Sequence, residues 1–259
     1  MFKRLTTSLS RPPQTVFFMK DSWGRIILYV LLLPIILIIP MLITTFVDPN
    51  MSITRYALLT QAIEEDFRIE NAAITDGVLT YQTATSASFE TIFSIYLGNQ
   101  NLNSKSFNFV FEQNDLVLYI ADVEMDRESY VDLNLLNHDF SSTDPDNLRS
   151  VNLALKSFIE RQPMVITTDI IINYTFALFD YLFVTLLMSL MMLIFVTKVQ
   201  FPYLMRFKLS VYLTTVWMVS ELILSLFNVQ YLDFVSVLLV YIYHVIAYRS
   251  IRVIKKGVI

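Results

Sequence analysis

Four long apolar runs divide this chain, and their lengths constrain its fold more than any other feature. They cover residues 26–47, 170–197, 209–228 and 231–248. A helix needs roughly 20 apolar residues to cross about 30 Å of hydrocarbon, and each run approaches or exceeds that length. A mean hydropathy of +0.54 agrees with this pattern. The sequence therefore predicts an integral membrane protein with an α bundle of four transmembrane helices.

Basic residues mark the expected cytoplasmic side. They gather in residues 1–25, 198–208 and 249–259, whereas the short connection at 229–230 has none. Cytoplasmic loops of membrane proteins carry an excess of Lys and Arg. We therefore expect a multi-pass protein with both termini and the 198–208 loop in the cytoplasm.

The segment between the first two runs has a different character. Residues 48–168 hold 18 of the 23 acidic residues and 7 of the 19 basic ones, for a local net charge of −11. About 120 residues are enough to bury an independent core. The absence of cysteine means that this core has no disulfides. We expect an acidic extracytoplasmic domain inserted between transmembrane helices 1 and 2.

The first run is expected to remain as an anchor. It is longer than the 7–15 residues of a signal-peptide core, and no small-residue cleavage pattern follows it. Pro34 and Pro40 lie within the run and predict kinks, which neighbouring helices accommodate in a membrane.

Periodic patterns predict an α+β fold for residues 48–168. Asp48 and Pro49 favour the start of one helix, and Asp144 and Pro145 favour the start of another that ends at Pro163. Strand patterns lie around a turn dipeptide, Asp76-Gly77, and in a second hairpin. For residues 83–106, strand and loop remain open alternatives. The predicted strands are residues 67–69, 78–81, 107–111 and 116–120.

Several short motifs resemble those of a known family. They are Arg11-Pro12-Pro13, Phe67-x-Ile69 before Asp76-Gly77, and Arg206-Phe207-Lys208 followed by Tyr212 and Thr214-Thr215. In these motifs and in its whole architecture the chain resembles an uncharacterised family of Gram-positive bacterial membrane proteins, some described as maltodextrin utilisation proteins. The resemblance implies a bacterial cell membrane and a link to sugar uptake. It implies no functional residues.

Polar side chains inside the predicted spans form the first candidate site. Such groups are unfavourable in lipid unless they are paired, protonated or hydrated, and no Lys or Arg lies within the runs. One interpretation is a proton or cation path lined by Asp180, Glu221 and His244. The other is hydrogen bonding between helices that holds the bundle together. The candidate residues are Asn173, Asp180, Glu221, Asp233 and His244.

A second candidate site is an acidic alternation. Asp122, Glu124, Asp126 and Glu128 are spaced by two residues, so an extended strand would present all four carboxylates on one face. Carboxylate oxygens are suitable calcium ligands. The alternative is a solvated strand face, because the glycine-centred loop of an EF-hand is missing.

Enzyme signatures are absent from the sequence. Four glycines cannot build a phosphate-binding or dinucleotide-binding loop. With no cysteine and two histidines on opposite sides of the predicted topology, we expect no zinc site of the usual type and no cofactor. His138 is expected to be a surface polar residue, since no nucleophile motif accompanies it. The acidity of the soluble part disfavours nucleic-acid binding.

The sequence thus favours a non-enzymatic membrane protein with an outward-facing binding domain. We expect an accessory, sensor or scaffold of a transport or envelope system. The alternative is a transporter or channel subunit that uses Asp180 and Glu221. Expected partners are membrane lipid, through the basic tails and residues 15–23, and another membrane protein or further copies of the chain.

Overall fold

The computed structural model describes residues 1–47, 50–98, 101–195, 202–227, 229 and 232–251. The chain divides into two compact units, and each is described by itself below. A helical unit combines Met1–Val47 with Thr167–Ile259, and an α+β unit covers Asp48–Ile166. The expected Asp48–Pro49 cap, the end of the second run at Thr197, and the tail cations after Ile251 lie outside the described residues.

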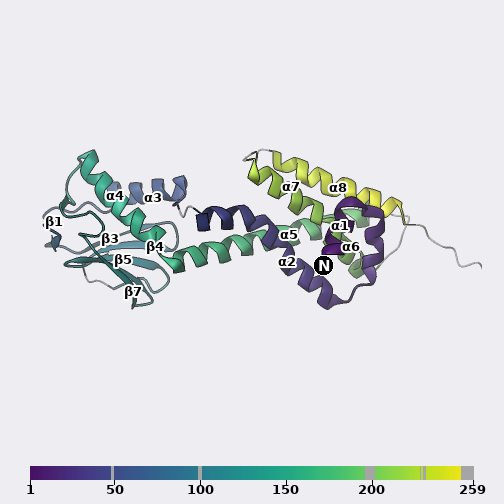
Figure 1. The fold of residues 1–259 in the computed structure, drawn as a ribbon, viewed down its shortest axis with the longest axis horizontal. Coiled ribbons are helices and arrows are strands. Elements are labelled where there is room, and N and C mark those ends of the chain that lie inside the picture. The colour runs from purple at the N-terminus through teal and green to yellow at the C-terminus, as the bar shows by residue number, and fades with distance from the viewer. Residues whose placement is uncertain (48–49, 99–100, 196–201, 228, 230–231, 252–259) are drawn as a thin grey trace, which may run out of the picture. The chain divides into compact units, whose positions relative to one another are not determined.

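The helical unit is built from long apolar helices and two short N-terminal ones (Figure 1). Only Thr214 separates α6 (Tyr203–Leu213) from α7 (Thr215–Leu226), so the two form one continuous apolar stretch. The elements are α1 (Phe2–Ser10), a 3-10 helix η1 (Pro12–Lys20), α2 (Trp23–Val47), α5 (Pro163–Phe195), α6 (Tyr203–Leu213), α7 (Thr215–Leu226) and α8 (Asp233–Arg249).

Three stretches of the described chain are long and apolar enough to cross a membrane, which supports a membrane protein. They are Trp23–Ile43, Pro163–Leu193 and Tyr203–Leu226. The second and third begin several residues before the predicted runs, because α5 starts at Pro163 and α6 at Tyr203. The fourth run forms α8, a helix of 17 residues that is not among these three.

The N-terminal segment packs against the long helices. The sequence predicts that residues 15–23 lie along the membrane interface. In the structure η1 contacts α6 and α8, and α1 contacts α6 and α7. Thr15 is buried, and Val16, Phe18 and Met19 pack on the apolar clusters of the unit. Much of this segment is therefore part of the helical core.

The α+β unit contains two sheets and two helices, α3 (Ile53–Glu65) and α4 (Pro145–Glu160). The larger sheet has the order β3-β4-β5-β6-β7, in which β4 and β5 are parallel and the other pairs antiparallel. The smaller sheet has the order β2-β1-β8. The strands are β1 (Ala73–Thr75), β2 (Val78–Thr80), β3 (Thr85–Phe89), β4 (Phe93–Leu97), β5 (Phe107–Phe111), β6 (Asp115–Ile120), β7 (Val123–Ser129) and β8 (His138–Asp139).

The core of this unit lies between the larger sheet and its helices. Figure 1 shows α3 and α4 on the same side of the sheet. Three phenylalanines of the sheet, Phe93, Phe109 and Phe111, are almost fully buried with Phe158 of α4 and Leu59 of α3. Burial of one such side chain contributes about 1.5–3 kcal/mol to stability. The unit therefore has the core that its length predicts.

Most predicted elements of the α+β unit are confirmed. The β5–β6 hairpin occurs as expected, and α4 is capped by Asp144, whose carboxylate accepts from the Asn147 N–H at 3.2 Å. The predicted strand at 67–69 is wrong, because these residues enter the core from a turn and belong to neither sheet. The open segment 83–106 contains β3 and β4. Ser52 caps α3.

Candidate functional site

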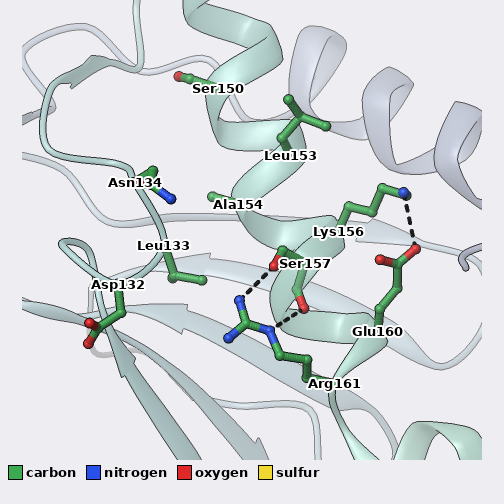
Figure 2. Close-up of a pocket in the computed structure, with 10 residues that line it drawn as sticks. All are labelled: Asp132, Leu133, Asn134, Ser150, Leu153, Ala154, Lys156, Ser157, Glu160 and Arg161. Atoms are coloured by element: carbon green, nitrogen blue, oxygen red, sulfur yellow. Dashed lines mark hydrogen bonds and ion pairs between the residues drawn. The ribbon is translucent and has the colours of Figure 1, made fainter. Parts of the chain in front are cut away.

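A groove of about 490 Å³ runs along α4 of the α+β unit. Figure 2 shows α4 on one side and the loop that carries Asp132 and Asn134 facing it. Buried Leu133 and Ala154 and the more exposed Leu153 supply its apolar surface. The other lining residues are Ser150, Lys156, Ser157, Glu160 and Arg161.

Charged groups gather at the C-terminal end of this groove. Lys156 Nζ lies 3.2 Å from Glu160 Oε1. Arg161 donates to the carbonyl and the hydroxyl of Ser157 at 3.1 and 2.6 Å (Figure 2), and it pairs with Glu128 of β7 at 2.6 Å. The groove thus presents hydrogen-bonding groups of both signs beside an apolar surface. Such a combination of apolar surface and convergent polar groups is typical of a binding site.

A second pocket, of about 440 Å³, includes His138 of β8. Contrary to the expectation of a surface residue, this imidazole is buried and packs edge-on against Phe140. Its burial lowers the pKa of His138 to about 4, so the ring is neutral at pH 7. Ser150 lies 3.5 Å from the ring but donates its hydroxyl to the Asn147 carbonyl at 2.6 Å. This geometry does not activate Ser150 as a nucleophile.

The acidic alternation on β7 does not present four carboxylates on one face. A bulge at Met125 of β7 places Glu124 opposite Tyr119 of β6 but Asp126 opposite Leu118, so these two acids lie on different faces. The remaining two acids are Asp122, which has a left-handed turn conformation, and Glu128.

Neighbouring side chains also engage these acids. Arg127 pairs with Glu124 and lowers the pKa of that carboxyl, whereas Gln162 donates to Asp126 at 2.7 Å. In the part of the chain that the structure describes, no group of three or more acidic or histidine side chains is arranged to hold a metal ion. The one-faced geometry expected for calcium binding is therefore wrong.

The intramembrane candidates divide into two groups. Glu221 of α7 accepts a hydrogen bond from Ser236 of α8 and lies within electrostatic reach of Asp180 and Asp233. His244 follows Asp233 by about 16 Å along α8, at 1.5 Å per residue. Glu221 thus has two other carboxylates in its electrostatic surroundings, and His244 is not among these groups.

Two of these candidates make hydrogen bonds of the kind that holds helices together or shapes them. The Nε2 atom of buried His244 lies 3.1 Å from the Ser210 hydroxyl of α6. Asn173 donates to the Asp169 carbonyl of its own helix at 2.8 Å. These contacts fit the interpretation of helix packing better than that of a path through His244.

A third polar cluster, absent from the candidates drawn from the sequence, surrounds Asp21 between η1 and α2. Arg4 donates to both carboxylate oxygens of Asp21, at 2.6 and 2.9 Å, and Tyr212 of α6 donates at 2.7 Å. Lys208 donates to the Asp21 carbonyl at 2.8 Å. The side-chain bonds, led by that of Arg4, lower the pKa of Asp21 to about 2.

Aromatic rings enclose this Asp21 cluster. Phe18 packs edge-on against Tyr212, with ring centroids 5.3 Å apart, and Arg4 lies 5.3 Å over the Phe18 ring. Lys208 lies 4.7 Å over the ring of Trp23. The cluster therefore joins the N-terminal segment, the start of α2 and α6 through charge-assisted bonds in a partly desolvated place.

Comparison with known families decides where this architecture belongs. Residues 2–250, nearly the whole chain, match the family described as "Protein of unknown function (DUF1189)". The chain belongs to the DUF1189 family. No curated protein and no solved structure is significantly similar to this DUF1189 protein.

The structure gives one sequence motif of this DUF1189 protein a physical role. Lys208 and Tyr212, which are far from the N-terminus in the sequence, meet at Asp21. One signal for this cluster was present in the sequence, because Asp21 is the sole acidic residue among the first 25, which include five cations. A lone carboxylate among cations at the start of a span indicates a paired group.

Proposed function

We propose that this DUF1189 protein is a non-enzymatic accessory, sensor or scaffold of a transport or envelope system in a bacterial cell membrane. In this proposal four spans place both termini in the cytoplasm and the α+β unit outside. The groove along α4 binds a peptide segment of a partner protein. Carbohydrate uptake is the system that the resemblance to maltodextrin utilisation proteins suggests.

The single observation that carries this proposal is the position of Glu160. It lines the groove and pairs with Lys156, and its carboxylate also accepts a hydrogen bond from the Met51 N–H. Met51 lies where the chain enters the α+β unit, and Glu160 lies just before α5 begins at Pro163. A partner that competes for Glu160 therefore acts on both segments that lead to the spans.

The groove residues provide a direct test. We expect Leu153→Glu, which places a charge on the apolar surface, to abolish partner recovery, and Lys156→Ala to reduce it. The measurement is quantitative mass spectrometry of proteins cross-linked to the full-length protein in intact cells. The comparison is with the unmodified protein at equal membrane abundance.

A matched control separates the groove from general surface effects. Val123→Glu changes another exposed apolar side chain of the same unit, since Val123 is 60% and Leu153 46% exposed. We expect Val123→Glu to leave partner recovery unchanged. An equal effect of both variants, or the same set of proteins recovered with Leu153→Glu, would contradict a binding role for the groove.

A transporter or channel subunit is the second candidate, favoured by the approach of Asp180 and Asp233 to Glu221. On this view Asp180→Asn and Glu221→Gln abolish ion flux in proteoliposomes, because the carboxylates carry the ion. His244→Gln should leave flux unchanged, since His244 bonds elsewhere. Proteoliposomes of the unmodified protein that show no flux above empty vesicles would exclude this candidate.

A further inference from the structure

Asp180 occupies an unusual place in the helical unit. It lies near the middle of the Pro163–Leu193 stretch of α5 and is exposed. Among the described residues, its side chain makes no hydrogen bond or ion pair, and its electrostatic neighbour is another acidic residue, Glu221. No Lys or Arg lies in residues 170–197 or 209–248 to neutralise it. The described part of the chain therefore supplies no hydrogen-bond partner and no counter-charge for this carboxyl.

Exposure at this depth of a span means contact with lipid unless another protein covers the residue. Ionisable side chains inside spans are unfavourable toward lipid and face protein or a water-filled cavity. The packed face of α5 is a different one, formed by Ala177, Tyr181, Val184 and Met188. The exposed face thus requires a covering surface that the described residues of one chain do not supply.

The surroundings of Asp180 fit a helix–helix contact. Phe176, Phe179 and Phe183 are 64–66% exposed and follow the spacing of three and four residues that forms a packing seam between helices. Asp180 lies directly beside this seam. A helix that packs on the three rings and carries a polar group at the same depth would place that group beside Asp180.

A second copy of the chain supplies such a group at the right depth. A twofold interface is self-complementary, so it places α5 against α5 with residues of equal depth in proximity. A carboxyl group is also self-complementary, because its protonated form donates and its ionised form accepts. Two Asp180 side chains sharing one proton therefore satisfy each other without a basic residue.

We propose that the exposed α5 face is a homodimer interface, in which the Asp180 carboxyls of two copies hydrogen-bond to each other beside a seam of Phe176, Phe179 and Phe183. This proposal does not depend on the groove or on its partner. It assigns to Asp180 a role in assembly.

The absence of cysteine permits a clean cross-linking test. We expect Phe176→Cys and Phe183→Cys to form disulfide-linked dimers when native membranes are oxidised, as seen on non-reducing gels. Leu238→Cys is the control, because Leu238 of α8 is 52% exposed but lies on another helix. Dimers that form at Leu238 as readily as at the α5 positions, or no dimers at the α5 positions, overturn the proposal.

Substitution of the carboxyl tests its part in the interface. We expect Asp180→Leu to weaken dimerisation roughly 3- to 20-fold, the range for one hydrogen bond between spans. Asp180→Asn should retain the dimer, since an amide both donates and accepts. The measurement is energy transfer between labelled full-length proteins diluted in liposomes, with gel filtration to verify folding.

Each remaining outcome decides the proposal. Dimerisation that Asp180→Leu leaves unchanged overturns it, and so does a cross-link from the α5 positions to a different protein alone. A basic membrane partner would produce the latter result. An Asp180→Asn variant that keeps the dimer yet loses flux supports the proposal, because assembly and transport are then separate roles of the same residue.

Discussion

Among individual residues, Asp21 is a carboxylate of the helical unit with several charge-assisted hydrogen bonds. Its side chain is largely buried and accepts from Arg4 and Tyr212. Removing one partner from such a site leaves the others desolvated and unpaired. Asp21 therefore links the N-terminal helix α1 to α6 through hydrogen bonds of its side chain.

The first prediction for a single residue concerns Asp21→Ala. We expect it to lower the free energy of unfolding by about 3 kcal/mol at neutral pH, because Arg4 loses its bidentate partner. The measurement is thermal unfolding of the full-length protein in detergent. Lys20→Ala is a suitable control, since Lys20 is an exposed neighbour.

The same variant has a predicted pH dependence. The folded state lowers the pKa of Asp21 to about 2 from its usual value of 3.8, so the bond contributes fully above about pH 4. The contribution is lost as the pH falls through about 2. The stability difference between Asp21→Ala and the unmodified protein should thus be constant from pH 7 to about 5 and shrink below about 4. A difference that grows on acidification would contradict the assignment.

Among helices and strands, sequence patterns predicted the elements whose conformation depends on neighbouring residues in the sequence. The cap at Asp144 and the alternation in residues 107–111 each specify a conformation without help from distant residues. The strand at 67–69 failed because Phe67 and Ile69 are apolar for a tertiary reason: they fill the core, where Phe67 packs beside Phe140 and Phe111. An apolar pair does not distinguish a strand from a buried turn.

The candidate sites likewise divide into those that a local sequence pattern predicts and those that depend on contacts between distant segments. Period-two spacing predicted a single acidic face on β7, but one bulge moved Glu124 to the opposite face from Asp126, and a sequence does not reveal such a bulge. Polar residues within apolar runs identified Asp180 and Glu221 directly. The groove along α4 and the Asp21 cluster depend on contacts between distant segments, which no single segment encodes.

For the chain as a whole, the division into two units follows the composition. The acidic residues that distinguish residues 48–168 belong to the α+β unit, whereas the helical unit contains the apolar stretches. Determining which side of the membrane the α+β unit occupies therefore tests the proposed location of the sites in both units.

The sidedness prediction uses single cysteines in the cysteine-free chain. We expect Val123→Cys, on the α+β unit, to react with a membrane-impermeant maleimide in intact cells. Phe17→Cys should react only after the membrane is opened, because Phe17 is 75% exposed in η1 on the expected cytoplasmic side. The opposite pattern would place the α+β unit in the cytoplasm and remove its proposed role as an outward-facing binding domain.

The bonds at Asp21 also have a consequence for biosynthesis. Arg4 and Asp21 leave the ribosome within 17 residues of each other, but Lys208 and Tyr212 follow Asp21 by 187 and 191 residues. Until then, the Asp21 carboxylate lacks the hydrogen bond from the Tyr212 hydroxyl, and the Asp21 carbonyl lacks the one from the Lys208 ammonium group. The bonds around Asp21 are therefore completed only after α6 has been synthesised, so a chain that ends before Lys208 lacks the two from Lys208 and Tyr212.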